Sequence, residues 1–104
     1  MRTIFLGCYA PQAMKGLIGG SDREAAVKAL LKTVGGKLVS LSFTRGEYDV
    51  ALVAELPDRN AGIGLTMAIQ ASGAFSKMTV LEELDMPPII AAAKKAAKVY
   101  KPAG

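Results

Sequence analysis

The stretch KLVSLSFTRGEYDVALVAEL, residues 37–56, decides the fold of this chain. Residues 37–44 alternate with period two: Val39, Leu41 and Phe43 are separated by small hydroxylated residues, which predicts a half-buried strand. Residues 48–56 are rich in Val, Ala and Leu and predict a second strand. The segment Arg45-Gly46-Glu47 between them predicts a tight turn, with Gly46 at a positive φ. Residues 37–56 therefore form an antiparallel hairpin.

A helix precedes this hairpin. Ser21 and Glu24 have the spacing of a capping box, with Ser21 as the N-cap. The apolar residues that follow recur at helical spacing and form one stripe, ended by Gly35-Gly36. The stripe consists of Val27, Leu30, Leu31 and Val34.

A second helix follows the hairpin. Asp58 is suited to be its N-cap, the helix runs to about residue 71, and Gly73 ends it. Residues 3–9 and 75–83 are short apolar runs that predict the first and last strands. The order β-α-β-β-α-β predicts an α+β fold, the ferredoxin-like plait, in which two helices cover one face of a four-stranded antiparallel sheet.

The chain divides into residues 1–86, the plait, and residues 87–104, a C-terminal helical extension of the same domain. Pro88 suits the first turn of the extension helix. We expect its apolar side to pack on the body or on a neighbouring subunit. The alternative, a basic helix lying on lipid or nucleic acid, is disfavoured because that side holds no Trp or Phe. The apolar side consists of Ile89, Ile90, Ala93, Ala97 and Tyr100.

Composition and charge exclude several function classes. The chain has no His and only one cysteine, Cys8, so imidazole chemistry, multi-cysteine metal sites and internal disulfides are excluded. The formal charge of +4 resides wholly in Lys94, Lys95, Lys98 and Lys101, which leaves residues 1–86 formally neutral. No apolar run approaches the ~18 residues of a membrane-spanning helix, and the N-terminus does not resemble a signal peptide. We expect a cytoplasmic protein that does not bind membranes.

The pairing in the hairpin also predicts which residues lie on the face of the sheet that the two helices leave open. A turn of even length pairs positions whose numbers add to an odd value, so Val39, Leu41 and Phe43 share the helix-covered face with Val50, Leu52 and Ala54. The open face then receives Ser40, Ser42, Thr44, Asp49, Ala51, Val53 and Glu55.

Nucleic acid is disfavoured as the partner of this face. RNA-binding plaits stack bases on aromatic side chains of the third strand, where this chain has Glu47 and Asp49. Simple exposure of the open face to solvent is disfavoured because Ala51 and Val53 lie at its centre. We therefore expect the sheet of a second copy to cover the face, giving a homodimer or a higher oligomer with a cavity between the sheets.

Gly46, Tyr48 and Asp49 form a G-x-Y-D signature that resembles the GYD-domain family. Gly35-Gly36-Lys37 before the hairpin and Ala54-Glu55-Leu56-Pro57-Asp58 after it are also typical of that family, and the resemblance covers roughly residues 3–83. It implies a dimeric α+β barrel in a small bacterial or archaeal protein of largely unassigned role. Related barrel superfamilies include cofactor-independent monooxygenases, isomerases and haem proteins, but a shared fold does not transfer their activities.

Several residues of the open face are candidates for ligand binding or catalysis. Asp49 and Glu55 are the candidate catalytic carboxylates; alternatively, Asp49 accepts hydrogen bonds from turn amides or from Ser42 or Thr44. Glu55 would need a partner such as Lys77 or a pocket ligand. The candidate ligand-binding residues are Ser40, Ser42, Thr44, Arg45, Asp49 and Glu55.

The remaining residues of the signature have structural interpretations. The alternation along the strand predicts that Tyr48 lies on the helix-covered face, with its hydroxyl at the edge of the core. Arg45 is predicted to form a surface ion pair with Glu47 or Asp49. The sequence favours a homo-oligomeric binding or assembly module with a small molecule in its inter-sheet cavity, and it predicts no metal or cofactor. The alternative is a cofactor-independent enzyme of the barrel class, monooxygenase-like or isomerase-like, that uses Asp49 or Glu55 as a base.

Overall fold

A computed structural model describes residues 1–103 and has the predicted α+β fold. The chain contributes four strands and four helices in the described range. In chain order the elements are β1 (Arg2–Tyr9), α1 (Pro11–Ile18), α2 (Arg23–Lys32), β2 (Lys37–Phe43), β3 (Val50–Glu55), α3 (Arg59–Ala71), β4 (Phe75–Glu82) and α4 (Met86–Val99).

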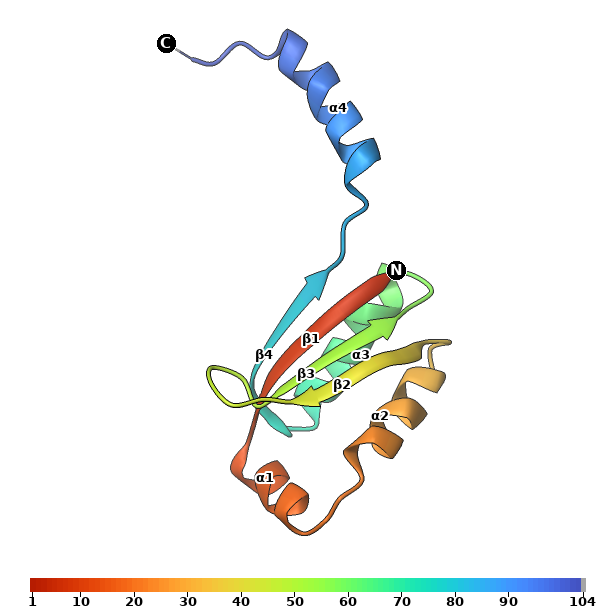
Figure 1. The fold of residues 1–104 in the computed structure, drawn as a ribbon, viewed down its shortest axis with the longest axis vertical. Coiled ribbons are helices and arrows are strands. Elements are labelled where there is room, and N and C mark those ends of the chain that lie inside the picture. The colour runs from red at the N-terminus through yellow and green to blue at the C-terminus, as the bar shows by residue number, and fades with distance from the viewer. Residues whose placement is uncertain (104) are drawn as a thin grey trace.

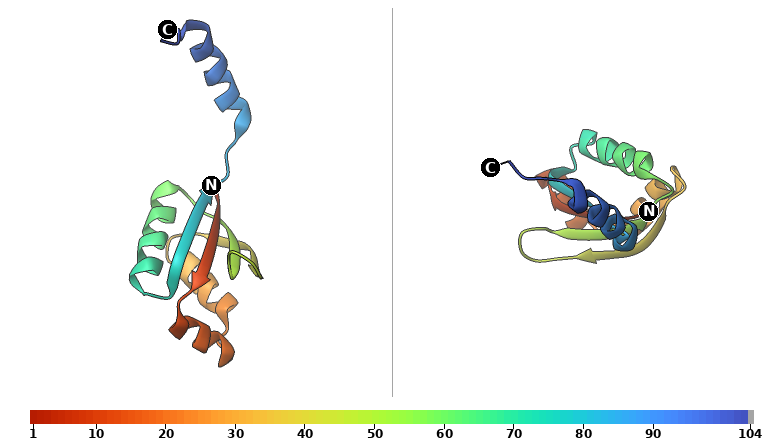
Figure 2. Two further views of the ribbon diagram at one scale, coloured as in Figure 1. Left: turned by 90° about the vertical axis from the view of Figure 1, so that its left-hand side faces the viewer. Right: turned by 90° about the horizontal axis from the view of Figure 1, so that it is seen from above.

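The four strands form one antiparallel sheet in the order β2-β3-β1-β4. This is the strand order of the ferredoxin-like plait. Helices α2 and α3 lie on the same face, whereas the side of the sheet turned toward the viewer in Figure 1 carries no helix. The view from above in Figure 2 also shows α3 on one side of the sheet only. The sheet thus has a helix-covered face and an open face.

The two covering helices begin at aspartates. The Asp58 carboxylate accepts a hydrogen bond from Ala61 N–H at 2.9 Å, as predicted for α3. In α2 the N-cap is Asp22, which accepts from Ala25 N–H at 3.1 Å, so the prediction of Ser21 is wrong by one residue. The reason is that the Ser21 N–H is bonded to Gly16 O, which ties Ser21 to the end of α1.

The β2–β3 register agrees with the predicted parity over most of its length. Leu41 pairs with Leu52 and Phe43 with Val50, joined by a loop of even length, residues 44–49. A bulge at Val39 shifts the register, so that Leu38 rather than Val39 packs against the core. The prediction for Val39 is therefore wrong: its side chain is 46% exposed.

The hydrophobic core lies between the sheet and α2 and α3. Its buried members come from the sheet side and from both helices, and the predicted stripe of α2 packs against them. The cluster consists of Phe5, Leu31, Ala54, Leu56 and Leu65.

Helix α4 stands away from the rest of the chain (Figure 1). None of its residues is buried, and Tyr100 beside it is 74% exposed. Of the two expected partners of its apolar side, the body of its own chain is therefore wrong, and a neighbouring subunit stays a prediction. Asp85, the N-cap of α4, has an extended backbone, and two prolines stand in the first turn of the helix. No helix within residues 1–103 is long and apolar enough to cross a membrane.

Candidate functional site

The loop of residues 44–49 folds across the open face instead of forming a tight turn. Figure 1 shows the loop reaching from β2 and β3 towards β4. The Tyr48 hydroxyl is 2.7 Å from Thr79 Oγ1 on β4, and Lys77 Nζ lies 5.0 Å from the Tyr48 ring centre. Tyr48 therefore lies on the open face, contrary to the prediction. The parity rule fails here because Tyr48 precedes β3, so strand alternation does not apply to it.

Asp49 binds the end of β1. Its Oδ2 accepts a hydrogen bond from Tyr9 N–H at 2.9 Å, and its own N–H donates to Gly7 O at the same distance. The backbone N–H of Thr44 in turn donates to Asp49 O. The carboxylate thus acts on the backbone of a neighbouring strand, rather than on the turn amides, Ser42 or Thr44.

Glu55 lies at the other end of β3, about 20 Å from Asp49 along an extended strand. Its carboxylate accepts from Arg2 Nε at 3.3 Å and contacts the N-terminal ammonium group at 3.4 Å. The hydrogen bond from Arg2 holds the pKa of this exposed carboxyl below its ordinary value. The predicted partner, Lys77, instead pairs with Glu47 at 3.1 Å.

The structure does not gather the other predicted ligand-binding residues into one site. Ser40 and Ser42 are exposed on β2, and Thr44 Oγ1 donates to Tyr48 O at 2.6 Å. Arg45 forms no ion pair in the part of the chain that the structure describes. Gly46 has the predicted positive φ, +139°. Residues 1–103 contain no group of three His, Cys, Asp or Glu side chains placed to hold a metal ion.

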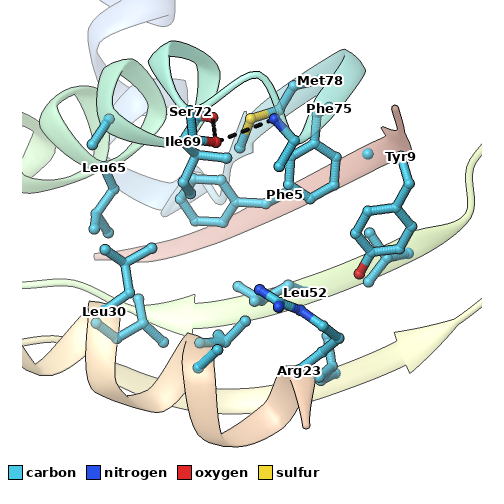
Figure 3. Close-up of a pocket in the computed structure, with 18 of the residues that line it drawn as sticks. Phe5, Tyr9, Arg23, Leu30, Leu52, Leu65, Ile69, Ser72, Phe75 and Met78 are labelled. Carbon is cyan, nitrogen blue, oxygen red and sulfur yellow. Dashed lines mark hydrogen bonds between the residues drawn. The ribbon is translucent and has the colours of Figure 1, made fainter. Parts of the chain in front are cut away.

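A cavity of about 250 Å³ lies on the other side of the sheet, between β1, β3 and the helices α2 and α3. Figure 3 shows its walls: Phe5 and Leu52 from the sheet, Leu30 from α2 and Leu65 and Ile69 from α3. Nearly all of the lining is carbon, which suits an apolar molecule.

Small side chains account for this cavity. Ala26 of α2 and Ala68 of α3 both line it, and neither fills the space between the helices. The space is open to solvent, since both alanines are exposed, so an apolar occupant would remove apolar lining surface from water. An occupant that binds only the folded chain would stabilise the fold.

Two polar side chains lie at one end of the cavity, whereas the third polar residue of the lining, Ser72, donates its hydroxyl to Ile69 O. Arg23, the first residue of α2, and Tyr9, the last residue of β1, lie there, opposite Leu30 and Leu65 (Figure 3). The Tyr9 ring stacks on Phe75 with ring centres 4.9 Å apart. Burial raises the pKa of the Tyr9 hydroxyl, Arg23 opposes this effect and Asp49 adds to it. Tyr9 therefore stays protonated near neutral pH and can donate a hydrogen bond.

Sequence reasoning missed this cavity. The spacing between two helices depends on how each packs on the sheet, which periodicity does not report. One local signal existed: Gly7 interrupts the apolar run of β1. A Cβ there would lie 2.6 Å from the Phe75 ring, so glycine lets Phe75 form the cavity wall.

The fold places this chain in the class of small α+β proteins that have a four-stranded antiparallel sheet with helices on one face. The chain belongs to the GYD-domain family, whose model matches residues 4–93 and so includes the first half of α4.

No curated protein matches the chain. Among solved structures, the crystal structure of hypothetical protein PHS023 from Pyrococcus horikoshii is similar. That protein is 18% identical over 82% of this chain and 93% of its own, with a TM-score of 0.49.

Proposed function

We propose that this chain is a small-molecule-binding module that assembles with copies of itself. The observation that carries the binding function is the 250 Å³ apolar cavity beneath α2 and α3. Engineered apolar cavities of about 150 Å³ stay dry and bind benzene. Scaling from that example, this cavity suits a ligand of roughly ten non-hydrogen atoms.

Binding without chemistry fits the lining better than catalysis does. Neither candidate carboxylate lines the cavity: Asp49 is bonded to Tyr9 N–H, and Glu55 is exposed with a lowered pKa. A base acting on a carbon acid needs a carboxylate near the bound substrate, with a pKa raised toward neutrality. The alternative, a cofactor-independent enzyme of the dimeric α+β barrel class using Asp49 or Glu55, has no such group in this cavity.

Self-assembly is supported by the open face. Its centre is apolar and partly buried or exposed, and among residues 1–103 only the loop of residues 44–49 lies over it. The residues are Ile4, Leu6, Ala51, Val53 and Leu81, which neighbour one another across β1, β3 and β4. A second sheet packed on this centre would enclose an inter-sheet space bordered by Ser40, Ser42 and Glu55, where a small molecule could also bind.

The shape of the chain supports the same assembly. Its radius of gyration is 17.6 Å, against roughly 13 Å for a compact domain of 100 residues, because α4 projects from the body. Isolated helices of this length are marginal in water. The apolar side of α4, which includes Ile89 and Ile90, would be stabilised by contact with a second copy.

A cavity-filling variant tests the binding function. The probe is 1-octanol, followed by isothermal titration calorimetry and by amide NMR shifts. We expect one site per chain in the wild type, lost in Ala68→Phe because the ring fills the cavity. The matched control, Ala71→Phe, places the same ring on the same helix at an exposed residue that does not line the cavity. If both variants bind octanol as the wild type does, the cavity is not the site.

A further inference from the structure

Arg23 gives one end of the cavity a positive charge. Among the described residues that line this cavity, Arg23 is the one with a charged side chain, and it is half-buried. No ion pair within residues 1–103 includes it. Its Nη1 donates to Ser21 Oγ at 3.0 Å, and a guanidinium group has further donors to offer.

The acidic residues beside Arg23 in the sequence are engaged elsewhere. The Asp22 carboxylate accepts from Ala25 N–H, and Glu24 pairs with Lys28 at 3.5 Å. The Asp49 carboxylate accepts from Tyr9 N–H. The positive charge of Arg23 is therefore not neutralised by a direct partner, although it borders an apolar space, where a charge without a counterion is unfavourable.

The Tyr9 hydroxyl lies at the same end of the cavity as Arg23 (Figure 3). A guanidinium group and a protonated phenol both donate hydrogen bonds, and a carboxylate accepts from both. The opposite end, at Leu30 and Leu65, has no polar group to offer. The cavity thus has one cationic, donating end and one hydrocarbon end.

From this arrangement we infer that the cavity binds a monocarboxylate with an apolar body of about eight carbons, its carboxylate at Arg23 and Tyr9 and its body between α2 and α3. A straight chain or a phenyl ring fits that size, which scales from benzene in a 150 Å³ cavity. The inference rests on the proposed binding function and specifies the chemical class of its ligand.

Calorimetry with four probes that differ in head group or in apolar body tests the proposed class of ligand. The probes are octanoate, 1-octanol, octylamine and acetate. We expect octanoate to bind about tenfold more tightly than octanol, because it adds charge-assisted hydrogen bonds. Octylammonium should bind more weakly than octanol, since Arg23 repels it. Acetate should not bind measurably, because it lacks the apolar body.

The variant Arg23→Gln should reduce the octanoate affinity to that of octanol and leave octanol binding unchanged. Lys28→Gln is the matched control, because it removes one positive charge from the exposed side of the same helix, and it should leave both affinities as in the wild type. Equal affinities of octanoate and octanol in the wild type would overturn the carboxylate class while the binding function stands. Failure of every eight-carbon probe to bind would overturn the binding function itself.

Discussion

The two faces of the sheet differ in what their side chains do. On the helix-covered face, apolar residues surround a cavity, and the two polar groups that line one end, Arg23 and Tyr9, leave donors free. On the open face, the carboxylates of Glu47 and Glu55 are paired, Glu47 with Lys77 and Glu55 with Arg2. The carboxylates of the open face, which suggested catalysis, thus form ion pairs within the chain. The helix-covered face, whose apolar residues predicted an ordinary core, has room for a ligand.

Core truncation should separate the two faces most strongly. Leu65→Ala on the helix-covered face should cost about 2–5 kcal/mol in the free energy of unfolding, because Leu65 is only 3% exposed and its loss enlarges the cavity. Ile4→Ala on the open face should cost clearly less in the monomer, since Ile4 is only partly buried. Urea denaturation at low chain concentration measures both. Equal losses would contradict an open face that is uncovered in the monomer.

A charge on the open face should prevent assembly. We expect the wild type to have at least twice the 10.8 kDa chain mass in light scattering at micromolar concentration, and Val53→Lys to be a monomer, because the new ammonium group would be buried without a partner. The control Ile63→Lys places the same charge on exposed α3 and should keep the oligomer. A monomeric wild type would refute the proposed assembly.

The loop of residues 44–49, which lies over the open face, should depend for its stability more on Gly46 than on the charge of Asp49. Gly46→Ala puts a Cβ at φ +139° and should destabilise the fold by roughly 1 kcal/mol or more. Asp49→Asn keeps an oxygen that can accept from Tyr9 N–H and should cost less. Denaturant midpoints compare the two. A larger loss for Asp49→Asn would show that the negative charge itself holds the end of β1.

The sequence predicted what depends on local pattern. The alternation around Leu41 and Leu52 gave the correct pairing and thus the correct faces, and Asp58 and Gly73 gave the limits of α3. The errors occur where a contact with a residue distant in the sequence determines the local structure. The bulge at Val39 needs its partner strand, and the position of Tyr48 needs Thr79 on a strand two places away.

The candidate site was harder to predict than the fold. Its predicted residues share one sheet face, and parity placed Ser40, Ser42 and Glu55 there correctly, but a shared face does not bring side chains together. Asp49 and Glu55 are held apart by the length of β3. The cavity arises from the separation of α2 and α3, and no motif in the sequence encodes that separation.

A smaller effect concerns pH. The hydrogen bond from Arg59 at 2.8 Å lowers the pKa of Glu82 below its ordinary 4.5. A carboxyl whose pKa is lowered by folding contributes stability above its unfolded pKa, and this contribution is lost as the pH falls through the folded value. Arg59→Gln should therefore remove a small part of the acid dependence below about pH 4.5 and leave the curve above it nearly parallel. An unchanged acid limb in denaturation midpoints would show that the exposed pair contributes nothing.

The smallest effect is expected from the charges of α4. Lys94, Lys95, Lys98 and Lys101 are exposed and supply the entire net charge of the chain, yet none forms an ion pair within residues 1–103. Replacing all four with Gln should leave the melting temperature and the oligomer mass unchanged, because Gln has nearly the same helix propensity and only solvated charge is lost. Replacing Ile89 and Ile90 with Gln is the contrasting variant, and it should reduce the oligomer mass if the apolar side of α4 contacts a second copy. A contrary result would be salt-dependent binding of the wild type to heparin or anionic vesicles that the lysine variant loses. That result would make the charged side of α4 the functional one.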